Sequence, residues 1–313
     1  MTAFSHSGPG SLCSGGLSRL LRALTPFVGV VMLLVCATAS EPQDWKKWKA
    51  KRRESVAGTN GWTTLIAREW LPEGRSGLGA GPTNAIRVPA GRGAESMGVF
   101  MRSSRVVRFE AADGVLATVS GKPIQSIQMV SDTNAVPTKL LIGGLAIQLI
   151  ERGEKFGIRI RDPQSAARRH FKGLRTFAYD PKWRIEGRFE AFPVSKILEV
   201  SDVIGGTQRF PSPGALVFQA AGQVCRLDVA VEPDEEDYFV MFKDRTAGDE
   251  TYGAGRFLYV SKPGPDGRVV IDFNKAYTPP CGFTSFATCP LPPRQNVLAF
   301  PIRAGERRPM DHP

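Results

Sequence analysis

The side chains best suited to chemistry lie in two stretches near the C-terminus, FKDRTAGDETYGAGRFLYV (242–260) and VVIDFNKAYTPPC (269–281). If the strand-like runs in these stretches lie side by side, their polar loops converge. An arginine such as Arg256 can grip an anion through two parallel hydrogen bonds, and paired carboxylates can act as general acid and base. The candidate ligand-binding residues are Asp244, Thr246, Thr251, Tyr252, Arg256, Asp272, Asn274 and Tyr277.

The same residues also allow a purely structural interpretation. Buried carboxylates need hydrogen-bonding partners, so Asp244 and Asp272 could accept backbone and Arg256 donors and hold irregular loops in place. We favour a protein that binds a small or anionic ligand at this polar site, with Arg256 as the anion anchor. The alternatives are a hydrolase-like enzyme that uses Asp244, Asp272 and Arg256, and a structural envelope protein. Whether the protein is an enzyme stays open.

Two cysteines in DFNKAYTPPCGFTSFATCPLPP (272–293) bear on the enzyme alternative. Cys281 and Cys289 close a short loop, so in an oxidising compartment we expect a disulfide between them, whereas a free Cys281 could serve as a nucleophile. His170 is the only histidine between the N-terminal segment and the C-terminal tail, which leaves a Cys-His or Ser-His-Asp site with one candidate base.

The sequence predicts neither a metal site nor a cofactor. Seven residues separate Cys281 from Cys289, instead of the two to four of a typical zinc site, and no histidine lies nearby. No glycine-rich phosphate loop opens a helix. Metal-assisted and nucleotide-dependent chemistry are therefore not expected.

Residues 1–39 have the pattern of a signal peptide. Arg19 and Arg22 precede the apolar run LTPFVGVVMLLVCATA (24–39), and its last three residues, Ala-Thr-Ala, match a small-x-small cleavage site. This run is shorter than the roughly 20 apolar residues of a membrane-spanning helix. We therefore expect export to the periplasm or the extracellular space, with an uncleaved membrane anchor as the alternative.

The charge balance is strongly basic, with a formal net charge of +11 and its densest basic patch at KKWKAKRR (46–53). A basic balance can favour anionic partners, but no Lys/Arg-rich cluster is interleaved with stacking aromatic side chains, so nucleic acid is not an expected partner. The patch is typical of a solvated helix face. Peripheral membrane association through the N-terminal segment stays open, and the sequence does not determine the oligomeric state.

Alternation of apolar and polar residues dominates the chain beyond residue 61. In WRIEGRFEA (183–191), Trp183, Ile185 and Phe189 fall on one face, and KFGIRIRD (155–162) repeats this pattern. Turn signals separate such runs at short intervals. The sequence therefore predicts a mostly β fold, an antiparallel sandwich or barrel-like arrangement.

A short amphipathic helix is expected before the strands, in EPQDWKKWKAKRRESV (41–56), where Trp45 and Trp48 share one face and Gly58 ends the helix. The strand alternation is interrupted at 163–183. We therefore expect an N-terminal β region over 43–163 and a C-terminal β domain over 175–306.

Part of the N-terminal β region, EGRSGLGAGPTNAIRVP (73–89), resembles the opening of a forkhead-associated β-sandwich. In that family a Gly-Arg pair and an Asn-Asp-Ile step precede a strand. Here Gly79 is followed by Ala80 in place of the phosphate-binding arginine, and Ala85 replaces the aspartate. The resemblance implies a related β framework without phosphopeptide binding.

The C-terminal motifs carry a second resemblance, which extends over roughly residues 43–306. FKDRTAGDETYGAGRFLYV, DFNKAYTPPCGFTSFATCPLPP and NVLAFPIRAGE (296–306) closely resemble the signature of the bacterial family catalogued as domain of unknown function 1684. The resemblance implies no activity, because that family has none established. One departure is Thr278, where the family tends to carry asparagine before Pro-Pro-Cys; if this position touches a ligand, specificity differs here.

Overall fold

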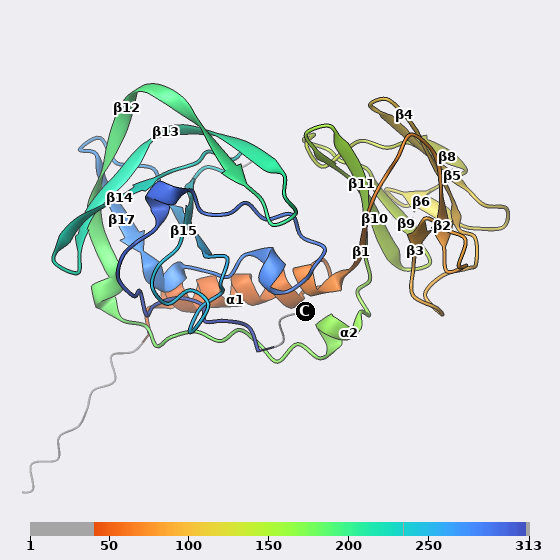
Figure 1. Cartoon of the computed structure of the whole chain (residues 1–313). Helices are drawn as coiled ribbons and strands as arrows, with labels where there is room; N and C mark the ends of the chain where they lie inside the picture. The colour runs from red at the N-terminus through yellow and green to blue at the C-terminus, as the bar shows by residue number, and fades with distance from the viewer. Residues whose placement is uncertain (1–40, 234, 311–313) are drawn as a thin grey trace, which may run out of the picture. The chain divides into compact units, whose positions relative to one another are not determined.

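The computed structural model describes residues 41–233 and 235–310 of the 313-residue chain. The predicted signal peptide, residues 1–39, lies outside the described residues. Within this described part of the chain, no helix is long and apolar enough to cross a membrane. Figure 1 shows how the helices and strands named below follow one another.

The N-terminal helix α1 (Gln43–Ala57) ends just before Gly58, as predicted. Its buried residues are Trp45, Arg52 and Val56. Trp48, which we expected on the same face as the first tryptophan, is only half-buried. The expected amphipathic character is therefore not clear, because the buried side includes a guanidinium: Arg52 Nε pairs with Glu306 Oε1 at 2.7 Å.

Residues 65–161 form two β-sheets that enclose one apolar core. The first sheet has the order β1 (Leu65–Trp70), β11 (Lys155–Arg161), β10 (Leu145–Arg152), β9 (Lys139–Ile142), β6 (Ala117–Val119), β7 (Lys122–Ile124). The second has the order β3 (Ile86–Arg87), β2 (Gly74–Gly79), β4 (Gly98–Ser103), β5 (Val106–Ala111), β8 (Ser126–Gln128). All of these strand pairs are antiparallel except β2 with β3. Two sheets on one core make the predicted sandwich.

Strand β11 shows why alternation matters for the site. Phe156, Ile158 and Ile160 pack in the core between the two sheets. Because successive side chains of a strand point to opposite faces, Arg159 and Arg161 project from the other face of the first sheet. Arg159 is nevertheless only 5% exposed, so another segment of the protein must cover that face of the sheet.

The C-terminal half contains a second pair of sheets. The larger has the order β14 (Gln223–Asp228), β13 (Thr207–Ala220), β12 (Arg184–Ser201), β17 (Arg268–Asp272), and the smaller pairs β15 (Tyr238–Phe242) with β16 (Arg256–Val260). All of these pairs are antiparallel. The long strands β12 and β13 curve over β15 in Figure 1, which gives a half-barrel. A register shift between Ala191 and Lys196 interrupts their pairing, and bulges of this kind bend strands. The mostly β, antiparallel prediction is confirmed.

Short helices connect these sheets: η1 (Trp62–Thr64), α2 (Ala166–Arg169), η2 (Pro181–Trp183), η3 (Phe273–Lys275), η4 (Pro280–Gly282) and η5 (Arg294–Asn296). The sandwich has its own core, and a further core fills the half-barrel around Phe218, Phe242, Leu258 and Phe273. Residues 41–313 nevertheless form one compact unit. The predicted division into residues 43–163 and 175–306 therefore stays a prediction.

Candidate functional site

The predicted anion anchor, Arg256, is part of a buried ion pair. It begins β16, is 1% exposed, and pairs through Nη2 with Asp244 Oδ2 at 2.8 Å. Its remaining Nη donors reach the carbonyl oxygens of Ile302, at 2.9 Å, and Ala304. The Arg256 Nε has no partner among the described residues, but it is completely buried and lines neither of the two cavities near this domain. The structure therefore supports a structural role for Arg256, which holds Asp244 and the 302–304 backbone together.

Asp244 is equally occupied. Its Oδ1 accepts hydrogen bonds from Thr246 N at 2.9 Å, Thr246 Oγ1 at 2.6 Å and Ile302 N at 3.1 Å. Burial opposes its ionisation, but the Arg256 charge and these hydrogen bonds outweigh burial and hold the pKa of Asp244 below its ordinary value. Thr251 completes the network through Thr246 Oγ1 at 2.8 Å. These four residues lie together as predicted, but none of them lines a cavity.

Asp272 and Asn274 form a separate polar group at the end of β17. Asp272 Oδ1 accepts from Asn274 N at 3.1 Å and from Asn274 Nδ2 at 2.9 Å. The Asn274 amide also exchanges two hydrogen bonds of 3.0 Å with the backbone of Asp180. No hydrogen bond or ion pair within residues 41–233 and 235–310 links Asp244 to Asp272, so the two carboxylates belong to separate networks, although Phe257 of β16 pairs with Tyr277 through two backbone hydrogen bonds.

The predicted disulfide is not formed. Cys281 and Cys289 are both buried free thiols, and the Cys281 backbone N–H donates to Cys289 Sγ at 3.1 Å. Burial and the hydrogen bond with Cys281 raise the pKa of the Cys289 thiol well above its ordinary value. Tyr252 packs above this pair and donates through its hydroxyl to Cys281 O at 3.2 Å. These hydrogen bonds and the packing of Tyr252 hold the loop between Cys281 and Cys289 without a disulfide bond.

Thr278, the departure from the family pattern, is fully buried and lies outside the cavity described below. Its backbone N–H donates to Glu306 Oε2 at 2.9 Å, and its carbonyl accepts from Arg52 Nη2 at 2.6 Å. Both contacts use the backbone of Thr278, while its Oγ1 is buried without a partner among the described residues, so the side chain at this position lies away from the wall of the cavity.

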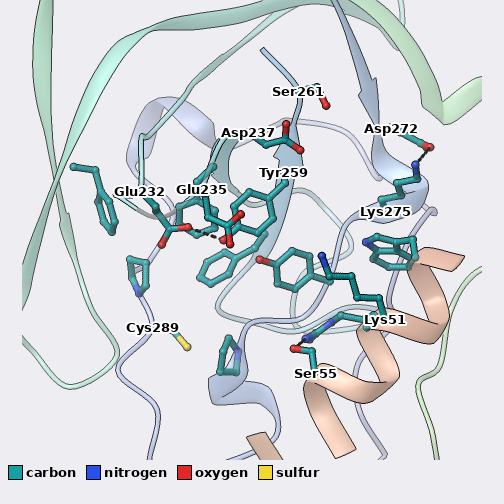
Figure 2. A pocket seen from close by; sticks show the side chains of 18 of the residues that line it. Lys51, Ser55, Glu232, Glu235, Asp237, Tyr259, Ser261, Asp272, Lys275 and Cys289 are labelled. Carbon is teal, nitrogen blue, oxygen red and sulfur yellow. Dashed lines mark hydrogen bonds and ion pairs between the residues drawn. The ribbon is translucent and has the colours of Figure 1, made fainter. Parts of the chain in front are cut away.

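A large cavity lies elsewhere, with a volume of about 1150 Å³. Helix α1, strands β16 and β17, the loop 232–237, the loop 287–290 and strand β11 all contribute to its walls. Figure 2 shows Glu232, Glu235 and Asp237 gathered with Tyr259, while Lys51 and Ser55 approach from helix α1. Of the candidate residues, Asp272 and Tyr277 line this cavity, and so does Cys289.

Aromatic rings form one wall of the cavity. Phe239 packs edge-on against Phe257 with 4.7 Å between ring centroids and lies 5.4 Å from Tyr259. Tyr259 in turn stacks on Tyr277 at 6.2 Å. The Arg52 guanidinium lies 4.6 Å from the Tyr277 ring centroid and closes this row toward helix α1. Such a wall can pack the apolar body of a ligand.

The loop between β14 and β15 brings acidic side chains to the same cavity. Tyr259 Oη donates to Glu232 Oε2 at 2.6 Å. Burial, together with the nearby charge of Glu235, raises the pKa of Glu232 despite this hydrogen bond. Among the described residues, no Lys or Arg forms an ion pair with Glu232, Glu235 or Asp237.

Arg159 also lines the cavity, and it has no ionic or hydrogen-bonding partner among the described residues. The loop 287–290 covers its face of the sheet, since Arg68 Nη1 donates to Ala287 O at 3.0 Å and Arg152 Nε to Thr288 Oγ1 at 3.1 Å. Within the described residues nothing accepts a hydrogen bond from the Arg159 side chain, and its Nε is completely buried. Burial, helped by the neighbouring positive charge of Arg152, lowers the pKa of Arg159 to about 10.

Neighbouring arginines show how unusual this is. Arg152 is paired with Asp132 at 2.9 Å, and Arg161 donates to Gly61 O at 2.8 Å. Both Arg159 and Arg161 lie over the Trp62 ring, at 5.7 and 5.2 Å. Buried charges are normally paired, and Arg159 differs from these neighbours because it has no ionic or hydrogen-bonding partner among the described residues.

The sequence-based candidates do not include Arg159, Glu232, Glu235 or Asp237. The alternation in KFGIRIRD assigns Arg159 to the polar face of a strand, and polar faces ordinarily contact water. Only the packing of a distant loop over that face buries it. The run EPDEED (232–237) is a charge cluster of the kind that usually lies in solvent, so the sequence holds no signal that distinguishes these residues.

Comparisons with known proteins identify a family but no activity. Residues 169–307 match the model of a family described as Protein of unknown function (DUF1684). No curated protein sequence matches the chain. A solution NMR structure of an uncharacterized protein from Haloarcula marismortui is 30% identical, with 46% of this chain and 81% of that chain covered and a TM-score of 0.39.

Two structures of FHA domains are also similar to part of the chain. The FhaA FHA domain complexed with the intracellular domain of Rv3910 is 15% identical, with 30% of this chain and 97% of that chain covered and a TM-score of 0.22. A structure from a study of phosphothreonine-dependent FHA domain interactions is 16% identical, with 31% and 96% covered and a TM-score of 0.22. At these scores neither similarity carries an argument about function.

Proposed function

The chain contains a domain of the DUF1684 family over residues 169–307, and from the geometry around that domain we propose that the protein binds a small organic anion in the 1150 Å³ cavity. Arg159 holds the carboxylate or phosphate of the ligand. The aromatic wall of Phe239, Phe257 and Tyr259 packs its apolar body.

The observation that carries the proposal is the unpaired guanidinium of Arg159. Its side chain is 5% exposed, and no described residue accepts a hydrogen bond from it or forms an ion pair with it, so the Trp62 ring offsets only part of the cost of desolvation. An anionic ligand offsets this cost by accepting two parallel, charge-assisted hydrogen bonds. A pocket that combines apolar and aromatic walls with a few placed polar groups is the usual form of a small-molecule site.

The proposal moves the anion site from Arg256 to Arg159 and assigns no reaction. The hydrolase-like alternative relied on Asp244, Asp272 and Arg256. Asp244 and Arg256 form an ion pair with each other and do not line the cavity. Export of the protein stays a prediction that rests on residues 1–39.

Benzoate is the probe that tests the proposal, because it joins a carboxylate to one aromatic ring. Calorimetric titration is made with wild type, Arg159→Met and Arg268→Met. Arg268 also lines the cavity, but its side chain is 74% exposed and pairs with Asp266 on the rim. We expect Arg159→Met to weaken benzoate binding by roughly 10-fold or more, the equivalent of one charge-assisted pair, and Arg268→Met to leave it within about two-fold. Equal affinity of wild type and Arg159→Met refutes the proposal.

A further inference from the structure

The cavity contains unpaired charge of both signs. Arg159, 5% exposed, contributes an unpaired cation from β11. Glu232, Glu235 and Asp237 contribute carboxylates from the loop between β14 and β15, and no described Lys or Arg forms an ion pair with them. All four residues line the same cavity.

Several cations of this cavity already have anionic partners. Arg52 pairs with Glu306 at 2.7 Å, and Arg152 pairs with Asp132 at 2.9 Å. Within the described part of the chain, Glu232, Glu235 and Asp237 have no such partner, although the cavity that they line is rich in positive charge. Glu235 is exposed and Glu232 and Asp237 are half-buried, so a cationic group of a ligand can reach them without displacing an ion pair.

The surroundings of the carboxylates suit a positively charged group. Tyr259 holds Glu232 through a hydrogen bond of 2.6 Å, which leaves Glu235 and Asp237 without side-chain hydrogen bonds in the described residues. Figure 2 shows Glu235 and Asp237 close to Tyr259, and Tyr259 belongs to the aromatic wall that includes Phe239 and Phe257. Aromatic faces attract ammonium groups, most strongly where water is excluded.

We infer that the ligand is a zwitterion, whose anionic group binds Arg159 and whose ammonium group binds Glu232, Glu235 and Asp237 beside the aromatic wall. This inference rests on the proposed function, because it assigns the second end of the same ligand. A molecule of this class neutralises both unpaired groups at once, whereas a simple anion leaves the acidic loop uncompensated.

Matched probes test the inference. The zwitterions 4-(aminomethyl)benzoate and 4′-(aminomethyl)biphenyl-4-carboxylate present two charge separations, and benzoate and biphenyl-4-carboxylate are their anion-only counterparts. Affinities are measured by calorimetric titration on the full chain. We expect at least one zwitterion to bind wild type roughly 10-fold more tightly than its counterpart, as one partly desolvated ion pair with a cation–π contact provides.

The deciding variant is Glu235→Gln combined with Asp237→Asn, which removes two charges without breaking a hydrogen bond. It should abolish the preference for the zwitterion while leaving affinity for the anion-only probe within about two-fold. Glu232→Gln, which keeps an oxygen for Tyr259, should reduce the preference in part. Glu186→Gln is the control, because Glu186 is an exposed carboxylate on β12 that lines another part of the cavity.

Each outcome has a separate meaning. Arg159-dependent binding of benzoate with no preference for either zwitterion overturns this inference and leaves the proposed function standing. A preference that survives the double variant also overturns it, because the ammonium group then binds elsewhere. Absence of Arg159-dependent binding for both anion-only probes overturns the proposed function and this inference together.

Discussion

Replacement of Arg159 by methionine should stabilise the ligand-free protein. Methionine retains an unbranched, flexible side chain that can fill the space of the arginine stem. It removes a guanidinium that is 5% exposed and has no hydrogen-bonding or ionic partner among the described residues. Most substitutions of buried residues destabilise a protein, so the expected sign is the opposite of the usual one.

The magnitude follows from the pKa of the group. Burial lowers the pKa of Arg159 from 12.5 to about 10, and at 1.36 kcal/mol for each pH unit this corresponds to about 3 kcal/mol. Because the pKa of a base is lowered on folding, the cost is fully present at neutral pH and disappears only as the pH rises through about 10. Loss of the cation–π contact with Trp62 offsets about 1 kcal/mol. The expected gain is about 2 kcal/mol, or roughly 4 °C in Tm.

Urea denaturation at pH 7 of wild type, Arg159→Met and Arg161→Met provides the measurement. Arg161 is the matched control, since it lies on the same strand face and over the same Trp62 ring but donates to Gly61 O at 2.8 Å. Arg161→Met should lose about 1 kcal/mol because that acceptor loses its donor. If Arg159→Met loses stability as its neighbour does, the guanidinium has a partner and the reasoning about an anion site is wrong.

Three further predictions concern the remaining polar groups. Arg256→Met should lower the free energy of unfolding by about 3–5 kcal/mol, because it leaves Asp244 as a buried charge without its cation. Denaturant titration measures this free energy. A loss below about 1 kcal/mol contradicts the structural role of Arg256. Burial raises the pKa of Glu232 above its ordinary 4.5, so the folded state binds more protons and stability falls as the pH rises above 4.5; stability curves of Glu232→Gln should show a smaller fall over this range, and an unchanged curve argues against burial. Cys281 and Cys289 should resist alkylation in the native protein and react after unfolding, and peptide mass spectrometry that finds them joined would contradict the free-thiol arrangement.

Much of the fold follows from local patterns in the sequence. The alternation in WRIEGRFEA and KFGIRIRD predicts strands because a strand places successive side chains on opposite faces, and this holds wherever the strand packs. Helix α1 ends at Gly58 as expected, and C-terminal motifs quoted from the sequence identify the DUF1684 domain. These features depend on neighbours in the chain, which a sequence displays directly.

The partners of the candidate site residues depend on tertiary packing, which no local sequence pattern shows. Arg256 and Asp244 are twelve residues apart and joined by a hairpin, so the sequence correctly placed them together. It could not show whether they face a cavity or each other. Two thiols separated by seven residues likewise suit a disulfide, yet in the fold the Cys281 backbone N–H donates to Cys289 Sγ and both sulfurs stay free thiols.

The sequence by itself determined the secondary structure, the β class of the fold and the family, because each rests on residue type and spacing along the chain. Only the tertiary structure decided that Arg256 forms an ion pair away from the cavity, whereas Arg159 lines the cavity and has no ionic partner among the described residues. That difference arises because the loop 287–290, more than 120 residues away, covers the outer face of β11 and supplies no acceptor to Arg159, whose Nε is completely buried. The cost of a charge depends on what surrounds it in space, and the surroundings of Arg159 are assembled from segments far apart in the chain.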